Sequence, residues 1–209
     1  YKIINSANKV KIINGSGVNL SKYKECIFPK QISFTLASRI IKNKGIEDFF
    51  AAANIISKKY KKNIKFIIAG KFEDSSFSLD KNYFFKEISK SNIEFLGWIE
   101  NQIEFMNKTS VYILPSSREG TPRSILEAMA SSKPIITYDV PGCRETVQDR
   151  YNGFLCEKGD IKSLVEKIEF FINNPEKIIS MGLNSLEIVK KKYDVNSVNM
   201  KIINELNYD

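Results

Sequence analysis

The segment PSSREGTPRSILEAMA at 115–130 combines a loop, a helix start and charged side chains. Thr121 followed by Pro122 is typical of an N-cap and a first helical residue, so we expect a helix to begin there. Its unpaired N–H groups would face the preceding loop, and Gly120 would let an anion approach the backbone closely. Arg123 would be unfavourable beside the positive end of the helix dipole unless a phosphate were bound between them, and a solvent-facing arginine is the alternative.

Two acidic residues belong to the same segment. Glu119 lies in the loop and is expected to project into a cleft at the edge of a sheet, whereas Glu127 lies more than one helical turn further on. There Glu127 could accept hydrogen bonds from neutral hydroxyls such as those of a ribose. On spacing alone the simpler interpretation is a capping or solvated loop acid at Glu119 and a surface helix acid at Glu127.

A second group of candidates follows the short apolar segments at 32–37, 64–69 and 93–96. These residues are Arg39, Lys44, Gly70, Gly97, Trp98 and Ile99. Ligands of doubly wound sheets bind beyond the carboxyl ends of the strands, so a site is expected among them. A guanidinium and an ammonium there could bind an anion such as a phosphate through charge-assisted hydrogen bonds. The alternatives are a surface pair of cations and, at Trp98, packing in the core or at the rim.

Short apolar runs alternate with longer amphipathic segments along the chain. This pattern predicts an α/β fold with a doubly wound, mostly parallel, Rossmann-like sheet. Strands are predicted at 9–13, 32–37, 64–69, 93–96, 111–114, 134–137 and 153–156. Helices are predicted at 45–60, 81–90, 101–108, 122–131, 160–173, 175–191 and 194–206, with Asp160 as an N-cap.

Composition narrows the classes of function. The net charge of +8 over 209 residues favours anionic partners, but Lys-rich runs such as SKKYKKN are typical of solvated helix ends, so nucleic acid is not expected. The absence of His and the three cysteines without a CxxC pair argue against a zinc site, a disulfide framework or a Ser-His-Asp group. No apolar run approaches the roughly 20 residues of a membrane span, and we predict a cytoplasmic protein.

The run from Glu119 to Cys156 resembles the most characteristic block of family-4 retaining glycosyltransferases, which have the two-domain GT-B fold. Its elements are EG at 119–120, Pro122, EAMA at 127–130, PII at 134–136, Gly142 with Glu145, and NG at 152–153. Arg39 with KG at 44–45 resembles another element of the family, and the likeness extends over about 9–190. One departure is Ser131-Ser132-Lys133, where the family generally has a small residue and Gly, which leaves the conformation of this turn open.

The resemblance implies a role for each candidate. Arg39 and Lys44 would bind the donor diphosphate, Glu119 would contact the donor sugar and Glu127 the ribose. The remaining donor-binding candidates are Gly120, Thr121, Pro122, Arg123, Gly70, Gly97, Trp98 and Ile99. The expected substrate is a nucleotide sugar, taken to be UDP-linked, without a metal or other cofactor.

The same resemblance implies a domain organisation and partners. Residues 1–28 would enter from a missing N-terminal acceptor domain, 29–190 would bind the nucleotide sugar, and 191–209 would form a helix crossing toward the missing domain. The acceptor would be a glycan or a polyprenol-linked glycan of bacterial surface polysaccharide synthesis, with a peripheral contact to the inner membrane surface. Two alternatives stay open: a nucleotide-sugar epimerase or hydrolase of the same fold, and a non-catalytic nucleotide-binding module.

Overall fold

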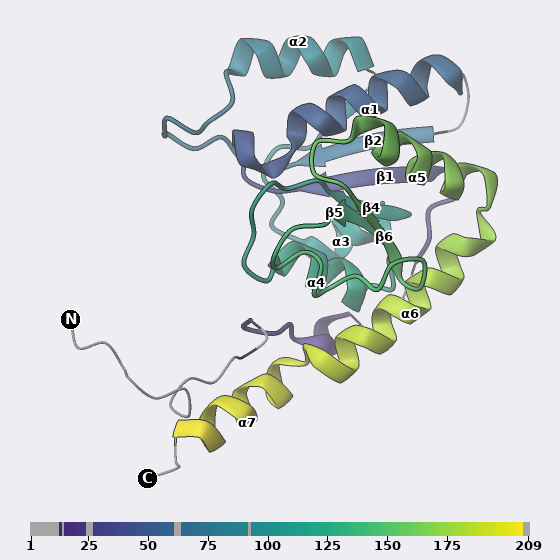
Figure 1. Ribbon diagram of the computed structural model, residues 1–209. Helices are drawn as coiled ribbons and strands as arrows, with labels where there is room; N and C mark the ends of the chain where they lie inside the picture. The colour runs from purple at the N-terminus through teal and green to yellow at the C-terminus, as the bar shows by residue number, and fades with distance from the viewer. Residues whose placement is uncertain (1–12, 14, 24–26, 61–63, 92, 207–209) are drawn as a thin grey trace.

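The centre of the molecule is a parallel β-sheet (Figure 1). The computed structural model describes residues 13, 15–23, 27–60, 64–91 and 93–206. In these residues the sheet has six strands in the order β3-β2-β1-β4-β5-β6. Their bounds are β1 Ile32–Ala37, β2 Ile64–Ala69, β3 Ile93–Phe95, β4 Val111–Leu114, β5 Ile135–Tyr138 and β6 Gly153–Cys156. Every strand pair is parallel, so all carboxyl ends lie at one edge of the sheet.

Helices cover both faces of the sheet, as the nearly continuous apolar character of the strands requires. α1 (Ile46–Lys59) packs against α2 (Lys81–Ser91) and α5 (Ile161–Asn173) on one face (Figure 1). α3 (Gln102–Asn107) and α4 (Arg123–Ala130) lie on the other, where α6 (Glu176–Lys192) packs on α4. α7 (Val195–Leu206) continues beyond the sheet.

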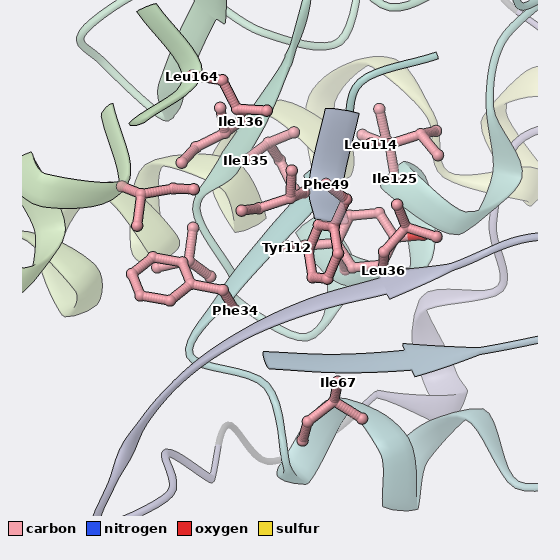
Figure 2. Close-up of a cluster of buried hydrophobic side chains, with 14 of the residues drawn as sticks. Phe34, Leu36, Phe49, Ile67, Tyr112, Leu114, Ile125, Ile135, Ile136 and Leu164 are labelled. Carbon is pink, nitrogen blue, oxygen red and sulfur yellow. The ribbon is translucent and has the colours of Figure 1, made fainter. Parts of the chain in front are cut away.

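The core is built where these layers meet. Figure 2 shows apolar side chains of the central strands packed with residues of three helices, namely Phe34, Leu36, Ile67, Tyr112, Leu114, Ile135 and Ile136 with Phe49, Ile125 and Leu164. Each of these side chains is almost fully buried. Burial of each such side chain stabilises the fold by about 1.5–3 kcal/mol relative to exposure. The packed core therefore holds the strands, and with them the strand ends, in fixed relative positions.

The strand order reverses between β1 and β4. β1 is followed along the chain by β2 on one side, whereas β4 and β5 extend the sheet on the other side. The loops leaving β1 and β4 therefore diverge and leave a crevice at the carboxyl edge, which is where ligands of this architecture bind.

The structure confirms the predicted α/β class, the doubly wound sheet and every predicted helix to within two residues. Six of the seven predicted strands are present. The predicted strand at 9–13 lies outside the described residues, apart from Ile13, which is in no strand. Gly15 and Gly17 have left-handed φ values of +66° and +71°.

The turn between α4 and β5 keeps a left-handed residue although the chain has no glycine there. Ser132 has φ +54°, a conformation that costs a residue with a Cβ about 1–2 kcal/mol. The buried Lys133 follows it, and its Nζ donates a hydrogen bond of 2.6 Å to the carbonyl of Ile27. This chain thus has a serine in the left-handed conformation at a turn where the family generally has a small residue and Gly.

The sequence predicts Asp160 as the N-cap of α5, and the structure confirms it. Asp160 Oδ1 accepts a hydrogen bond of 3.0 Å from the Ser163 backbone N–H. We expect Asp160→Ala to lower the free energy of unfolding by about 1 kcal/mol, because this N–H loses its partner. Asp160→Asn should retain most of the stability, and urea denaturation of the three proteins measures the difference. Equal losses in both variants would show that the cap hydrogen bond is not the cause.

Candidate functional site

A cavity of about 420 Å³ opens at the carboxyl edge of the sheet, at the reversal of strand order. Residues from the exits of β1, β2, β3 and β4, from the start of α3 and from α4 line it. They are Ala37, Ser38, Arg39, Lys44, Ala69, Gly70, Trp98, Ile99, Gln102, Leu114, Glu119, Pro122, Arg123, Ser124 and Glu127. Positions as distant in sequence as 37 and 127 therefore share one cleft.

An ion pair forms one wall of this cavity. Lys44 Nζ lies 2.6 Å from Glu119 Oε1, and the two side chains are only 13% and 10% exposed. Lys44 ends a short 3-10 helix, η3 (Lys42–Lys44), and Glu119 belongs to the loop after β4. The Asn43 carbonyl links these segments, because it accepts hydrogen bonds from Ser117 N at 3.0 Å and Ser116 Oγ at 2.8 Å.

Two glycines allow the close backbone approach that this wall needs. Gly45 has φ +70°, and a Cβ on it would lie 1.9 Å from the Pro115 carbonyl oxygen. Gly142, in the loop after β5, has φ +84°, and a Cβ there would lie 1.5 Å from the Gly120 carbonyl oxygen. The loop that carries Glu119 is thus enclosed by backbone on both sides, and a side chain at either glycine would displace it.

The start of α4 corrects one detail of the sequence prediction. Thr121 is not the N-cap and Pro122 is not the first helical residue: Pro122 is the N-cap, with an extended ψ of 113°, and Arg123 begins the helix. The Pro122 carbonyl accepts the first helical hydrogen bond, from Leu126 N at 3.2 Å. Proline disfavours the helical conformation in the residue before it, which keeps Thr121 outside the helix.

The second predicted cation, Arg39, reaches the same cavity from the end of β1. Its Nη1 lies 3.3 Å and 3.2 Å from the two carboxylate oxygens of Glu73, in the loop after β2. The Arg39 side chain is 53% exposed, so this pair is screened by solvent. Arg39 and Lys44 therefore line a single cavity, as the sequence predicts, and each has an acidic partner.

Glu127 lies on the helical side of the cavity and is partly desolvated. Its Oε1 accepts a hydrogen bond of 3.2 Å from Arg123 Nε, one turn back on α4. Burial raises the pKa of the Glu127 carboxyl, and the nearby Arg123 and Lys22 lower it by less. Arg123 is itself 75% exposed, so an ion pair along the helix accounts for part of its position.

The raised pKa of Glu127 makes stability depend on pH. Above the ordinary value of 4.5 and below the raised value, the folded chain binds more protons than the unfolded chain, so the free energy of unfolding falls as pH rises through this window. We expect Glu127→Gln to gain stability relative to wild type as pH rises from the ordinary value of 4.5 through the raised pKa, because the amide has no charge to desolvate. Urea unfolding across this range measures it, and a difference independent of pH would contradict the prediction.

The exits of β2 and β3 close the far side of the cavity. Gly70 N donates to the Gly97 carbonyl at 2.7 Å, which ties the two exits together. Trp98 lines the cavity and is 63% exposed, and Lys71 Nζ lies 5.1 Å from the centroid of its ring. The indole is thus a rim residue with an accessible surface, and not part of the core.

Nine of the twelve predicted site residues line the cavity: Arg39, Lys44, Gly70, Trp98, Ile99, Glu119, Pro122, Arg123 and Glu127. Gly97, Gly120 and Thr121 do not, and their contacts are with neighbouring backbone or, at Thr121, with Gly15. The sequence prediction missed Gln102 and Ser124, which also line it. Ser124 could have been found as the next residue of the α4 first turn, whereas nothing in the local pattern singles out Gln102.

Within the described residues, no group of three or more Cys, Asp and Glu side chains is arranged to hold a metal ion. The helices described here include none that combines the length and the apolar character needed to cross a bilayer.

Over residues 21–186 the sequence matches the protein family described as glycosyl transferases group 1. A curated relative from Staphylococcus aureus, the capsular polysaccharide biosynthesis glycosyltransferase CapM, is 34% identical over 156 residues. Another, from Campylobacter jejuni, is N,N'-diacetylbacillosaminyl-diphospho-undecaprenol alpha-1,3-N-acetylgalactosaminyltransferase, 24% identical over 205 residues. These alignments cover 74% and 91% of this chain but only 40% and 52% of the relatives, so the chain spans about half of their length.

Solved structures show the same fold. Staphylococcus aureus TarM, in a complex with fondaparinux, alpha-GlcNAc-glycerol and UDP, aligns with a TM-score of 0.77 and 25% identity over 88% of this chain and 38% of TarM. The C-terminal domain of LpcC from Francisella tularensis, a glycosyl transferase group 1 protein, aligns with a TM-score of 0.73 and 22% identity over 86% of this chain and all of that domain. The fold is that of the C-terminal half of GT-B glycosyltransferases, and by the match over 21–186 the chain belongs to the group 1 glycosyl transferases.

Proposed function

We propose that this chain is the donor-binding half of a retaining glycosyltransferase that moves a sugar from a UDP-linked donor to a glycan or lipid-linked acceptor. The observation that carries the proposal is the single cavity that brings Arg39, Lys44, Glu119 and Glu127 together beside the start of α4. These residues come from two stretches of sequence, 39–44 and 119–127, which lie about 75 residues apart along the chain.

The cations suit the leaving group of sugar transfer. When the bond between the anomeric carbon and the phosphate oxygen breaks, its electron pair stays on the phosphate, and negative charge grows on the diphosphate. Arg39, Lys44 and the first N–H groups of α4 would stabilise this charge through charge-assisted hydrogen bonds and the helix dipole. Lys44 has three N–H donors and uses one on Glu119, which leaves donors for the phosphate.

The two acids would orient the donor. Glu119, which is paired with Lys44, would accept hydrogen bonds from the sugar hydroxyls. Glu127 lies further along α4 and would accept hydrogen bonds from the ribose, with Trp98 and Ile99 on the side where the base would lie. The desolvation that raises the pKa of Glu127 also strengthens hydrogen bonds to neutral hydroxyls, because water competes less.

The similar proteins support the substrate class. TarM is solved with UDP, and the names of CapM and the Campylobacter enzyme concern capsular polysaccharide and an undecaprenol-linked glycan. We therefore propose a role in bacterial surface polysaccharide or glycan synthesis, at the cytoplasmic face of the membrane. Retention of the anomeric configuration follows from the family resemblance, and the acceptor would be held by a further domain of the protein.

Thermal unfolding with a panel of nucleotides tests this proposal. UDP at about 100 times its Kd should raise the Tm by about 5–10 °C, since binding then adds about 2.7 kcal/mol. Arg39→Ala should lose most of this shift, while Lys42→Ala, an exposed residue of the same segment, should retain it. GDP and ADP report on base selection, and a single-stranded oligonucleotide is the negative control. No shift with any nucleoside diphosphate would favour a module without a donor site.

A further inference from the structure

We propose that Glu73 is a positioning residue of the donor site, which orients the Arg39 guanidinium toward the donor diphosphate. This inference rests on the proposed function and adds a residue that is absent from the cavity wall. Both carboxylate oxygens of Glu73 lie within 3.3 Å of one nitrogen, Nη1, of Arg39. Arg39 lines the cavity and Glu73 does not, so Glu73 contacts the guanidinium from outside the cavity.

The contact leaves Arg39 able to bind an anion. A guanidinium has five N–H donors in a rigid plane, and only Nη1 donates to Glu73. Nη2 and Nε, along the other edges of the same plane, have no hydrogen bond to Glu73 and could donate to phosphate oxygens together. By holding Nη1, Glu73 thus sets the direction of the donors on Nη2 and Nε of Arg39.

Glu73 itself lies on a segment that main-chain hydrogen bonds hold against the exit of β1. Ile40 N donates to the Lys71 carbonyl at 2.9 Å, and Leu79 N donates to the Ile40 carbonyl at 3.2 Å. The neighbouring Phe72 is anchored by ring contacts with Phe84 and Phe95, at centroid distances of 5.1 Å and 6.4 Å. The carboxylate is therefore presented from a support that is fixed relative to the strand that carries Arg39.

The expected benefit is preorganisation and not fold stability. Arg39 is half-exposed, and ion pairs of this kind contribute little to folding. A free arginine side chain loses rotamer freedom when it binds a ligand, and a side chain that is already held loses less. Loss of Glu73 should therefore appear in the affinity for a phosphate ligand, with the unfolding midpoint nearly unchanged.

Competition would give Glu73 the opposite effect, because a carboxylate paired with Arg39 occupies donors that a phosphate would otherwise accept from. The two effects differ in sign. If Glu73 orients Arg39, its removal weakens UDP binding, and if Glu73 competes, its removal tightens UDP binding. The position of Glu73 outside the cavity wall favours orientation, because a phosphate in the cavity need not displace it.

The test is a titration of the 209-residue chain with UDP and with uridine, which lacks phosphate, followed by NMR chemical shifts. Glu73→Ala should raise the Kd for UDP by about threefold to tenfold and leave the Kd for uridine unchanged. Glu73→Gln keeps an oxygen that can accept from Arg39 and should lose less. Glu87→Ala removes the partner of Lys90 on α2, away from the cavity, and serves as the matched control.

A double-mutant comparison completes the experiment. In an Arg39→Ala background, Glu73→Ala should cause no further loss of UDP affinity, because there is no guanidinium left to orient. An unchanged or lower Kd for UDP in Glu73→Ala, or an equal loss with and without Arg39, overturns the inference. If wild type binds uridine and no nucleoside diphosphate, the proposed function fails and this inference fails with it, which is a different result from normal UDP binding by Glu73→Ala.

Discussion

Replacing Lys44 with methionine is expected to lower the free energy of unfolding by about 2–4 kcal/mol, because the substitution leaves a nearly buried carboxylate without its partner. Lys44 Nζ is 2.6 Å from Glu119 Oε1, and neither side chain is more than 13% exposed. Lys42→Met, which removes an exposed lysine from the same short helix, is the matched control and should change stability by less than about 0.5 kcal/mol. Urea denaturation measures both differences.

The same substitution separates stability from nucleotide binding. Adding Glu119→Gln to Lys44→Met removes the unpaired charge and should restore much of the lost stability. It should not restore UDP affinity, which we expect to fall by about tenfold to a hundredfold in both proteins for lack of the ammonium. If the double variant recovers UDP binding together with stability, Lys44 supports the fold alone and does not bind the diphosphate.

Gly45→Ala is the second substitution with a large expected effect. It should lower the free energy of unfolding by about 3 kcal/mol or more, from left-handed strain and from a clash that forces η3 away from the loop after β4. The added Cβ would lie 1.9 Å from the Pro115 carbonyl oxygen, and φ is +70°. Because η3 carries Lys44, UDP binding should weaken as well, and calorimetry on the folded variant measures this.

Gly159→Ala separates the effect of left-handed strain from the effect of the steric clash. Gly159 has a similar φ of +79°, but a Cβ there would meet nothing within 4 Å, so only the strain of about 1 kcal/mol is expected. Gly159 does not line the cavity, and UDP binding should be normal. Equal effects of the two alanines on stability would show that the close approach at Pro115 is not important.

Features that depend on local sequence could be predicted in this protein. The apolar runs at 32–37 and 111–114 are strands in the structure, since a parallel strand covered on both faces needs apolar residues throughout. The Asp160 cap was predictable because its partner is three residues away. It was also predictable that Arg39, Lys44 and Glu119 line one cavity, because the carboxyl ends of parallel strands share one edge of the sheet.

Features that depend on partners distant in sequence could not be predicted. Lys44 and Glu119 are 75 residues apart, and Arg39 and Glu73 are 34 apart, so no local pattern indicates which acid pairs with which cation. The predicted N-cap of α4, Thr121, was wrong by one residue, because Pro122 is the N-cap and Arg123 begins the helix. Helix ends are the part of an element that sequence patterns define least well. Gln102 reaches the cavity only through the placement of α3.

A crystal structure of the chain soaked with UDP tests the central claim most directly. We predict diphosphate oxygens within hydrogen-bonding distance of both Arg39 and Lys44 and of the first N–H groups of α4, with the ribose hydroxyls at Glu127. A nucleotide whose phosphates lie away from these two side chains, or outside the cavity between β1 and β4, would contradict the claim and leave only the family and the fold.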